Sequence, residues 1–400
     1  MRVYLSLLKT PGVARIIAAQ LTARFPGGML SLAYLLHIEQ LHQSYGAAGL
    51  VLAATSVGQA IAGPLTSRWM GVWGMRPVIS LTLVICASSI FTIAFVPMSI
   101  PLTMLVGFLG GLSMPPIQPA VRTIYPKMVN SRQLTPLFSL DASAQEIIWV
   151  VGPVVATFLA IQVSPVVAIV VTGGFLVVGG LWFLSSPELG RVRIPRSRQR
   201  IGAVLRIRPV LLATVTGFLL VGACAAIEVG VVAVFGHDGP QAGIVLAVFS
   251  VGSLAGGLAL GHLPIGPWAL ARRMLVLFVG FAIAAVWLDF WWLNLALFIA
   301  GIGIAPALAV MFAIVSASVK FSDTAEAYGW VGTGQLIGAA LGSAIAGFLI
   351  DANGAIGAFW AAIGLALLGF LVPVIFRRWH PDLRGRDASP IPDTEPVTLP

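Results

Sequence analysis

The sequence contains few charged residues: only 9% of its 400 residues are Asp, Glu, Lys or Arg, whereas 58% are hydrophobic. Soluble globular proteins carry about 25% charged residues, so this chain has too little polar surface to coat a water-soluble globule. The shortage of charge therefore excludes a soluble protein and predicts an integral membrane protein.

Cysteine is also scarce, and the motifs of several enzyme classes are missing. Cys86 and Cys224 both lie inside apolar stretches, so no disulfide framework is indicated. The sequence has no Gly-Lys-Ser/Thr phosphate-binding loop and no His or Cys cluster with metal-ligand spacing. It also lacks the repeated charge rings of a channel. We therefore expect no enzyme activity, no metal and no cofactor.

Long apolar stretches recur along almost the whole chain. A helix needs about 20 apolar residues to cross the hydrocarbon core of a bilayer. Twelve stretches are candidates, the ninth being short and closely followed by the tenth: 14–37, 46–66, 77–96, 102–124, 136–161, 165–185, 209–235, 241–261, 273–290, 292–316, 325–350 and 355–376.

Among the connections between these stretches, only alternate ones contain Lys and Arg, which also occur at the chain ends. The remaining connections hold Glu39, Asp238, Asp289 and Asp351 and no basic residue. Cytoplasmic loops collect Lys and Arg, which predicts a plasma-membrane protein with both ends in the cytoplasm. The net charge of +9 is then mainly a signal of topology and of attraction to anionic membrane lipids. Nucleic-acid binding is not expected, because the basic residues are scattered without aromatic interleaving.

One long polar stretch divides the twelve candidates into two sets of six. It predicts an N-terminal bundle over 1–186, a basic cytoplasmic linker over 187–208 and a C-terminal bundle over 209–378. The tail, 379–400, is polar and Pro-rich, a composition typical of disorder.

The two sets of six resemble each other in sequence. LFSLDASAQEIIWVVGPVVATFL, from residue 137, aligns without gaps to AYGWVGTGQLIGAALGSAIAGFL, from residue 327, and brings Gln145 onto Gln335 at an offset of 190 (335 − 145). The same offset carries Gly111 onto Gly301 in the preceding stretch. Shared by two segments, this offset indicates two copies of one unit.

Two six-helix halves, a basic central loop and cytoplasmic ends resemble the major facilitator superfamily of secondary transporters. The resemblance covers nearly the whole chain. It implies an all-α integral membrane protein whose two pseudo-symmetric bundles surround a central cavity. The segments ARFPGG, PPIQPAVR and LDASAQEIIWVVGP are similar to actinobacterial efflux-type members.

The superfamily's loop motif between its second and third helices is only partly present. Gly74 and Arg76 match it and are the expected conformational loop, but Gly71 and Val72 stand where an Asp-Arg pair is usual. The acid of an Asp-based lock is therefore absent from these positions. Prolines interrupt stretches that, by the resemblance, line the cavity, and they predict helix breaks at Pro26, Pro115, Pro116 and Pro306.

Two carboxylates interrupt the fifth apolar stretch. A charge at the bilayer centre costs at least about 2.5–3.5 kcal/mol, so each acid needs a local reason. Asp141 lies near the predicted cytoplasmic start of its helix, whereas Glu146 is about 10 residues in and so near the midplane. The repeat places Val331 and Leu336 at these positions in the second half, so the shared fold does not require acids there.

Two arginines are the predicted counter-charges. Arg24 is about 10 residues into a first helix that runs in the same direction, which gives it the depth of Glu146. Arg122 could reach Asp141 across a short connection. Two interpretations remain open: both pairs are structural clamps, or Glu146 exchanges a proton as water enters and leaves, releasing Arg24 or a substrate.

A third acid, Glu228, lies in the outer part of the seventh stretch, which by resemblance lines the cavity. It is either a second proton or substrate site or an interfacial residue that reaches external water. The other expected cavity residues are Gln118, Gln145, Met311, Trp330 and Gln335.

These features predict a monomeric secondary transporter that works by alternating access. Proton-coupled efflux of a small hydrophobic or drug-like compound is the first expectation. Uptake of a sugar or another small polar solute, by symport or facilitated diffusion, is the alternative.

Overall fold

The computed structural model describes residues 2–236, 240–386 and 388–393. Asp238, one of the acids used to predict the topology, lies outside the described residues, as do residues 394–400 of the tail. In the described part, the regular secondary structure is helical apart from one isolated bridge between Lys320 and Ile391. The prediction of an all-α fold is confirmed.

The first half and the linker contain ten α-helices and one short 3-10 helix. They are α1 (Arg2–Lys9), α2 (Val13–Arg24), α3 (Pro26–His42), α4 (Tyr45–Trp73), α5 (Met75–Phe95), α6 (Ile100–Leu112), α7 (Ile117–Met128), α8 (Ser131–Gln162), α9 (Pro165–Ser185), α10 (Pro187–Arg191) and η1 (Ala203–Arg206).

The second half follows, with a divided fourth span as in the first half. Its elements are α11 (Arg208–Phe235), α12 (Gln241–Leu260), α13 (Ala269–Ala284), α14 (Phe290–Gly301), α15 (Ile304–Ser316), η2 (Phe321–Asp323), α16 (Thr324–Asn353), α17 (Ile356–Ile375) and η3 (Arg377–Trp379). The fourth span consists of α14 and α15, whereas the first span, α11, is continuous.

Ten helices or paired helices of the described chain are long and apolar enough to span a membrane. The first and ninth predicted spans are not among the ten. The first is divided into α2 and α3, and the ninth is α13, which has 16 residues and begins four positions before the predicted start at 273. The prediction for 273–290 was wrong at its end as well, because the helix stops at Ala284 and a short connection precedes Phe290.

Three of the four predicted prolines mark two helix breaks. Pro26 is the first residue of α3, directly after the junction at Phe25, and Pro115 and Pro116 separate α6 from α7. Proline has no N–H to continue a helix, which explains these junctions. Pro306 differs from the prediction: the break between α14 and α15 is at 302–303, and Pro306 lies in the first turn of α15.

The sequence repeat corresponds to a shared packing plan within the two halves. Gly111 of α6 touches the backbone of α4 at Thr55, and Gly301 of α14 touches that of α12 at Phe249. A Cβ added at either glycine would lie 2.0 or 2.2 Å from the facing carbonyl oxygen. Both approaches therefore require glycine.

The fifth long helix of each half packs on the first in the same manner. Gly152 of α8 meets Gly28 of α3, and Gly342 of α16 meets Gly222 of α11. The partners Gly28 and Gly222 are 194 positions apart (222 − 28), as are the partners in the preceding pair, whereas the fourth and fifth spans repeat at 190. The two bundles are thus pseudo-symmetric, as predicted.

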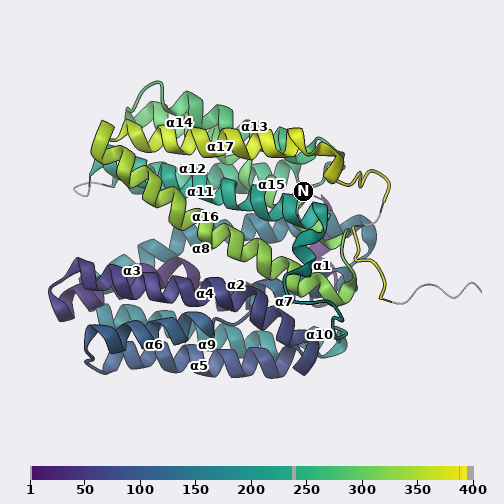
Figure 1. Ribbon diagram of the computed structural model, residues 1–400, viewed down its shortest axis with the longest axis horizontal. Helices are drawn as coiled ribbons and strands as arrows, with labels where there is room; N and C mark the ends of the chain where they lie inside the picture. The colour runs from purple at the N-terminus through teal and green to yellow at the C-terminus, as the bar shows by residue number, and fades with distance from the viewer. Residues whose placement is uncertain (1, 237–239, 387, 394–400) are drawn as a thin grey trace, which may run out of the picture.

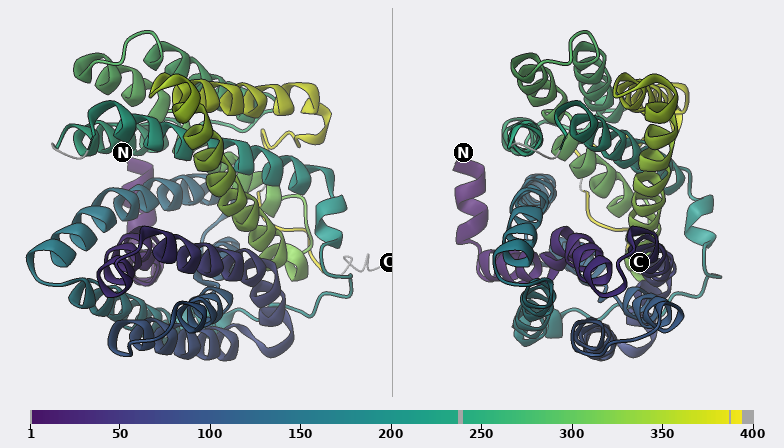
Figure 2. Two further views of the ribbon diagram at one scale, coloured as in Figure 1. Left: turned by 60° about the vertical axis from the view of Figure 1, so that its left-hand side comes forward. Right: turned by 90° about the vertical axis from the view of Figure 1, so that its left-hand side faces the viewer.

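The two halves lie side by side and meet more closely at one end than at the other. α16 runs from the second half at the left of Figure 1 to the first half at the right, where it packs on α4. α8 contacts α12 and α15 of the other half. Figure 2 shows both halves from two further directions, with the linker running along the outside between them. We call the end with the basic connections the basic end and the opposite end the acidic end.

The chain after α17 is more ordered than its composition predicted. Leu383 donates its backbone N–H to Ile265 O at 2.9 Å, and Ile391 donates to Val319 O at 2.9 Å. Phe321 in turn donates to Ile391 O at 3.0 Å. The prediction of disorder was therefore wrong for the described residues up to 393, because backbone hydrogen bonds hold this part of the tail to the basic end of the second half.

Candidate functional site

A cavity of about 470 Å³ lies between the halves. Its lining comes from α2, α3, α4, α7 with the connection before it, α8 and α9 of the first half, and from α11, α12, α15 and α16 of the second. The ionisable residues of this lining include Arg24, Glu146 and Glu228, and its amides are Gln59, Gln118, Gln145 and Gln335. Apolar and aromatic residues complete the wall, among them Tyr34, Met114, Trp149, Phe249, Leu308 and Leu336.

Two residues expected in the cavity lie elsewhere. Met311 is completely buried within the helix packing around α15. Trp330 faces the linker, where its indole Nε1 lies 3.4 Å from Glu326 Oε1 and its ring lies beside Gly202. Both predictions were wrong, for different reasons. Met311 is on the same face of α15 as the lining residues Ile304 and Leu308, but it lies farther along the helix toward the basic end, beyond the cavity. Trp330 is on the wrong face of its helix, because a helix turns by about 100° per residue. On α16 the lining passes through Tyr328 and Gly332, and position 330 is on the other face.

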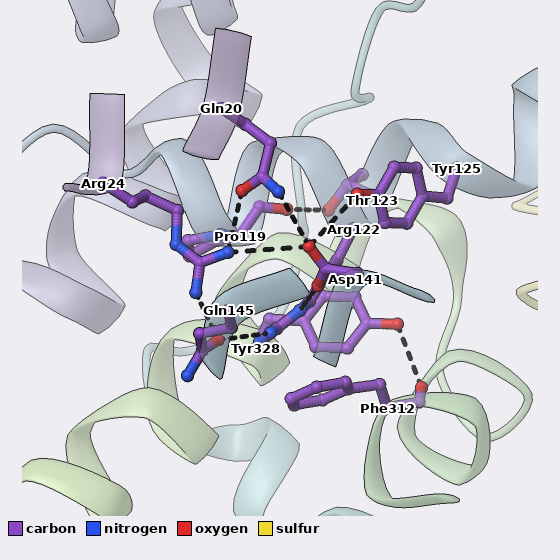
Figure 3. Close-up of polar contacts among 10 residues, drawn as sticks. All are labelled: Gln20, Arg24, Pro119, Arg122, Thr123, Tyr125, Asp141, Gln145, Phe312 and Tyr328. Carbon is purple, nitrogen blue, oxygen red and sulfur yellow. Dashed lines mark hydrogen bonds and ion pairs between the residues drawn. The ribbon is translucent and has the colours of Figure 1, made fainter. Parts of the chain in front are cut away.

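Asp141 is the centre of a buried network on the first-half side of the cavity (Figure 3). Its carboxylate is completely buried. Arg122 Nε donates to one carboxylate oxygen at 3.0 Å, and the other accepts from Gln20 Nε2 at 3.0 Å and from the Tyr125 hydroxyl at 3.2 Å. Arg24 Nη1 lies 3.5 Å from the same second oxygen. The predicted contact of Arg122 with Asp141 is therefore present, within a larger set of donors.

The predicted pair of Arg24 and Glu146 does not form. Arg24 donates to Gln20 Oε1 at 2.7 Å and to Gln145 Oε1, in addition to its ion pair with Asp141. Asp141 and Gln145 are four positions apart and share one face of α8, whereas position 146 is turned away from them by about 100°. Equal depth in the membrane did not predict the partner of Arg24, because the face of the helix also decides which side chains meet.

Glu146 instead connects the two halves. Its Oε1 accepts a hydrogen bond at 2.9 Å from the hydroxyl of Ser253 on α12. That hydroxyl oxygen also accepts from the backbone N–H of Ala305 at 3.2 Å. Within the described residues, Glu146 has no basic side chain at ion-pair distance, and Glu228, a second carboxylate, lines the same cavity.

The Asp141 network also touches the second half. The Arg122 guanidinium lies over the ring of Phe312, 3.4 Å from its centroid. Phe138, Phe312 and Tyr328 form an aromatic group beside it, with ring centroids 6.3 to 6.4 Å apart. Tyr328 donates its hydroxyl to Phe312 O at 3.0 Å. A cation held over an aromatic face away from water is stabilised there.

Further polar contacts join the halves, beside this network and between it and the basic end. Arg68 Nη1 donates to Glu326 Oε2 at 2.7 Å, and Thr333 Oγ1 donates to Ala60 O at 2.8 Å. On the other side of the cavity, the Tyr4 hydroxyl donates to Gly257 O at 3.0 Å, and Ser139 Oγ donates to the same oxygen at 2.7 Å.

These contacts close the cavity on its basic side. In the part of the chain that the structure describes, no side-chain hydrogen bond or ion pair between the halves lies nearer the acidic end than that of Glu146 with Ser253. Lining residues of the cavity nearer that end include Leu30, Tyr34 and Leu52. The structure is therefore closed at the basic end and parted toward the acidic end.

The expected conformational loop makes its contacts within the first half. Gly74 is the single residue between α4 and α5 and has φ +90°, a conformation that glycine adopts without strain. Arg76 Nη2 lies 3.4 Å from Ser186 O at the end of α9.

Several residues of the site were missed in the sequence. Gln20 and Tyr125 are common helix residues with no pattern that marks them as partners of Asp141. Ser253 lies in a Gly-rich stretch that is typical of close helix packing, so the sequence gives no sign of its polar contact. Arg68 and Glu326 lie more than 250 positions apart, and no spacing rule joins them.

The family model described as Major Facilitator Superfamily matches this sequence over residues 16–288 and 225–398. The chain belongs to the major facilitator superfamily. Its members are transporters rather than enzymes, so this superfamily protein is a multi-pass membrane protein of secondary transport that acts on a small molecule. Among curated proteins, none matches the sequence.

Solved structures of other superfamily transporters share the fold. The human organic anion transporter MFSD10 (TETRAN) superposes with a TM-score of 0.69 at 18% identity, over 90% of this chain and 99% of its own. A bacterial homologue of the iron transporter ferroportin, in an outward-facing state, superposes with a TM-score of 0.71 at 12% identity, over 92% of this chain and 98% of its own. The expected superfamily fold is confirmed, whereas the similarity to actinobacterial efflux-type members stays a prediction.

Proposed function

We propose that this superfamily member is a proton-coupled antiporter that exports a small hydrophobic or drug-like compound by alternating access. The observation that carries the proposal is Glu146, a cavity carboxylate without a basic partner in the described residues and hydrogen-bonded across the halves to Ser253. The Lys and Arg residues of the connections and chain ends lie at one end, which supports a plasma-membrane location with the basic end and both chain ends in the cytoplasm. The protein acts as a monomer, because each half completes the cavity of the same chain.

Burial makes the ionised form of Glu146 costly, and this favours proton uptake when the cavity loses water. In the present state the cavity is parted toward the acidic end, from which a proton can reach the carboxylate. Neutral Glu146 is cheaper to enclose, so protonation favours closing the acidic end. Opening of the basic end then hydrates the carboxylate and releases the proton to the cytoplasm as a substrate enters.

Glu228 is a second carboxylate that supports proton or cation binding in the cavity. It is an exposed side chain on the wall of the cavity that Glu146 shares. Two carboxylates in one cavity attract a proton or a cationic compound, and the cavity's aromatic and aliphatic wall accommodates an apolar body.

The Asp141 network is the part of the site that acts as a clamp. Arg122, Gln20 and Tyr125 all donate to its buried carboxylate, so the charge is compensated in place. A fully compensated buried carboxylate has little reason to exchange its proton in each cycle. We therefore assign coupling to Glu146 and rigidity of the first half to Asp141.

The test is transport by the purified protein in liposomes that contain a pH-sensitive dye, screened with lipophilic cations, drugs and sugars. We expect substrate-dependent proton movement in the parent protein and its loss in Glu146→Gln, whose amide oxygen can still accept from Ser253. Asp351→Asn, which removes an exposed acid of α16, is the matched control and keeps proton movement. Equal proton movement in parent and Glu146→Gln would overturn the assignment.

Uptake of a polar solute is the second candidate, and the amides of the cavity favour it. Gln59, Gln118, Gln145 and Gln335 offer donors and acceptors of the kind that orient a sugar-like molecule. In the same liposomes, saturable sugar movement without proton movement, unaffected by Glu146→Gln, would establish facilitated diffusion.

A further inference from the structure

A second cavity, of about 620 Å³, lies at the basic end of the second half, away from the central site. Its walls are the connection from α12 to α13, the first turns of α13, and the chain from the end of α17 into the tail. The lining contains one carboxylate, Asp382, and five arginines: Arg272, Arg273, Arg377, Arg378 and Arg384. We call this the arginine cavity.

Most of this positive charge is not neutralised within the protein. Arg384 is paired with Asp382, whose carboxylate lies 2.6 Å from its guanidinium and has a pKa lowered to about 2 by hydrogen bonds from Arg384. Arg272 and Arg378 are exposed and make no side-chain hydrogen bond or ion pair with other described residues. Arg377 lies over the Trp268 ring, 5.1 Å from its centroid. The cavity thus presents several cationic groups to a ligand.

The arginine cavity also contains an unpaired buried polar atom. His380 lines it and is only 4% exposed. Its Nδ1 donates to Pro381 O at 2.7 Å, and its Nε2 has no hydrogen-bond partner. Burial lowers the pKa of this histidine, and the positive charge of Arg273 lowers it further, although its backbone hydrogen bond opposes the shift. A buried polar atom without a partner is costly, which points to a ligand that supplies one.

The backbone adds to the positive potential. α13 begins at the cavity with no acidic residue in its first turn and no side chain capping its N-terminus. The free N–H groups at a helix start favour anions, phosphate groups in particular.

Exposed apolar side chains lie next to the charges. Leu263 and Trp268 line the cavity and are 42% and 38% exposed, and Ile375, near the end of α17, is 68% exposed. Basic residues beside exposed apolar and aromatic ones are the pattern of a membrane interface, where an anionic headgroup lies above its acyl chains.

We propose that the arginine cavity binds the phosphate headgroup of an acidic phospholipid in the leaflet at the basic end. Arg272, Arg377 and Arg378 bind the phosphate oxygens, since Arg273 already donates to the carbonyls of Pro306 and Leu260 and Arg384 is paired with Asp382. Because His380 donates through Nδ1, its Nε2 accepts a hydrogen bond from a hydroxyl of the headgroup, such as one of glycerol. Leu263, Trp268 and Ile375 lie along the acyl chains. The chemistry of phosphate recognition would also suit a soluble phosphate compound, but the neighbouring apolar surface favours the lipid.

The test is the thermal unfolding of the full chain in a neutral detergent, titrated separately with phosphatidylglycerol, phosphatidylcholine and inorganic phosphate. A ligand that binds the folded state raises Tm. We expect a saturable rise in Tm with phosphatidylglycerol, and a much smaller change with the other two. The double variant Arg272→Ala/Arg378→Ala should lose at least half of the rise, while its Tm without lipid stays close to that of the parent, because neither side chain is bonded.

Arg191→Ala/Arg193→Ala is the matched control, since it removes two exposed arginines from the same end of the molecule outside the cavity. It should keep the full rise. An equal rise with inorganic phosphate would overturn the lipid as occupant, and a rise that the Arg272/Arg378 variant keeps, or no rise at all, would overturn the site. None of these measurements involves transport, so they are independent of the proposed function.

Discussion

The two interfaces between the halves, α8 with α12 and α4 with α16, are built on one plan and carry different chemistry. At the first, the Ser143 side chain lies against Gly257, and Ser139 donates its hydroxyl to the carbonyl oxygen of Gly257. At the second, Gly63 lies against Gly329 and Thr333. Ser139 and Ser143 of α8 correspond to Gly329 and Thr333 of α16 at the offset of 190. Gly63 of α4 corresponds to Gly257 of α12 at the offset of 194, so both contacts are made by the same positions of the repeat. The backbone contacts of both interfaces therefore follow from the duplicated unit.

The polar groups of the interfaces differ between the two copies. The position of Glu146 is Leu336 in the second copy, and that of its partner Ser253 is Gln59 in the first. The hydrogen bond of Glu146 to Ser253 is thus found at one interface only. This asymmetry indicates that the carboxylate is an addition to the shared scaffold.

The reverse asymmetry occurs at the basic end. The ion pair of Arg68 and Glu326 belongs to the α4 and α16 interface, and the corresponding positions at the other interface are His262 and Pro136. One interface therefore carries its charge near the cavity centre and the other near the basic end. Alternating access needs both interfaces to part and close, so each charge sits where one of these movements occurs.

The contact of Arg122 with Phe312 also comes from the repeat. These residues occupy the same position in the two copies (312 − 122 is 190), as do Phe138 and Tyr328, which also touch. Equivalent positions meet where the pseudo-two-fold axis passes between the halves. The two copies differ at this point, with a guanidinium in one and an aromatic ring in the other.

The largest effect is expected when Asp141 is replaced by its counterpart in the second half. Asp141→Val leaves Arg122 and Arg24 buried without their carboxylate, and breaking a buried pair in this way costs about 3–5 kcal/mol. Chemical or thermal unfolding in detergent measures the loss. Asp351→Asn, at an exposed acid, should leave stability almost unchanged. A loss in Asp141→Val no larger than that of this control would contradict the role of the network as a clamp.

A smaller effect, on the balance between states, is expected from Arg68→Gln. The substitution removes the ion pair with Glu326, whose other carboxylate oxygen still accepts from Gly202 N. We therefore expect the free-energy difference between the closed and open states of the basic end to shift by about 1–2 kcal/mol in favour of the open state. Pulsed electron resonance between spin labels at the exposed positions 73 and 263 should show a larger population of long distances.

His262→Gln is the control for this comparison, because it changes the counterpart of Arg68, an exposed histidine. The distance distribution should stay that of the parent. If both variants, or neither, shift the distances, the ion pair does not set the state of the basic end.

The smallest effect on stability is expected from Glu146→Leu, which gives the first half the residue of the second. One hydrogen bond is lost and an apolar side chain is gained, so the free energy of unfolding should change by no more than about 1 kcal/mol. Proton coupling in liposomes should nevertheless be lost. A stability loss as large as that of Asp141→Val would show that Glu146 is structural.

The sequence determined the membrane class, the division into two bundles and the superfamily fold. It also identified the charged residues that lie inside apolar stretches. These properties depend on composition and on runs of about 20 apolar residues, which are local and therefore readable from the chain alone. The offset of the repeat likewise anticipated the matching glycine contacts of α6 and α14. The sequence could not assign proton coupling to Glu146, and this role stays a proposal.

Only the tertiary structure decided which side chains meet. Glu146 contacts Ser253 rather than Arg24, Met311 and Trp330 lie outside the cavity, and the tail joins the second half through Leu383 and Ile391. Such pairings depend on the rotation of each helix and on contacts across hundreds of positions. A turn of about 100° per residue moves a side chain from one neighbour to another without any change in its depth, so depth alone leaves the partner open.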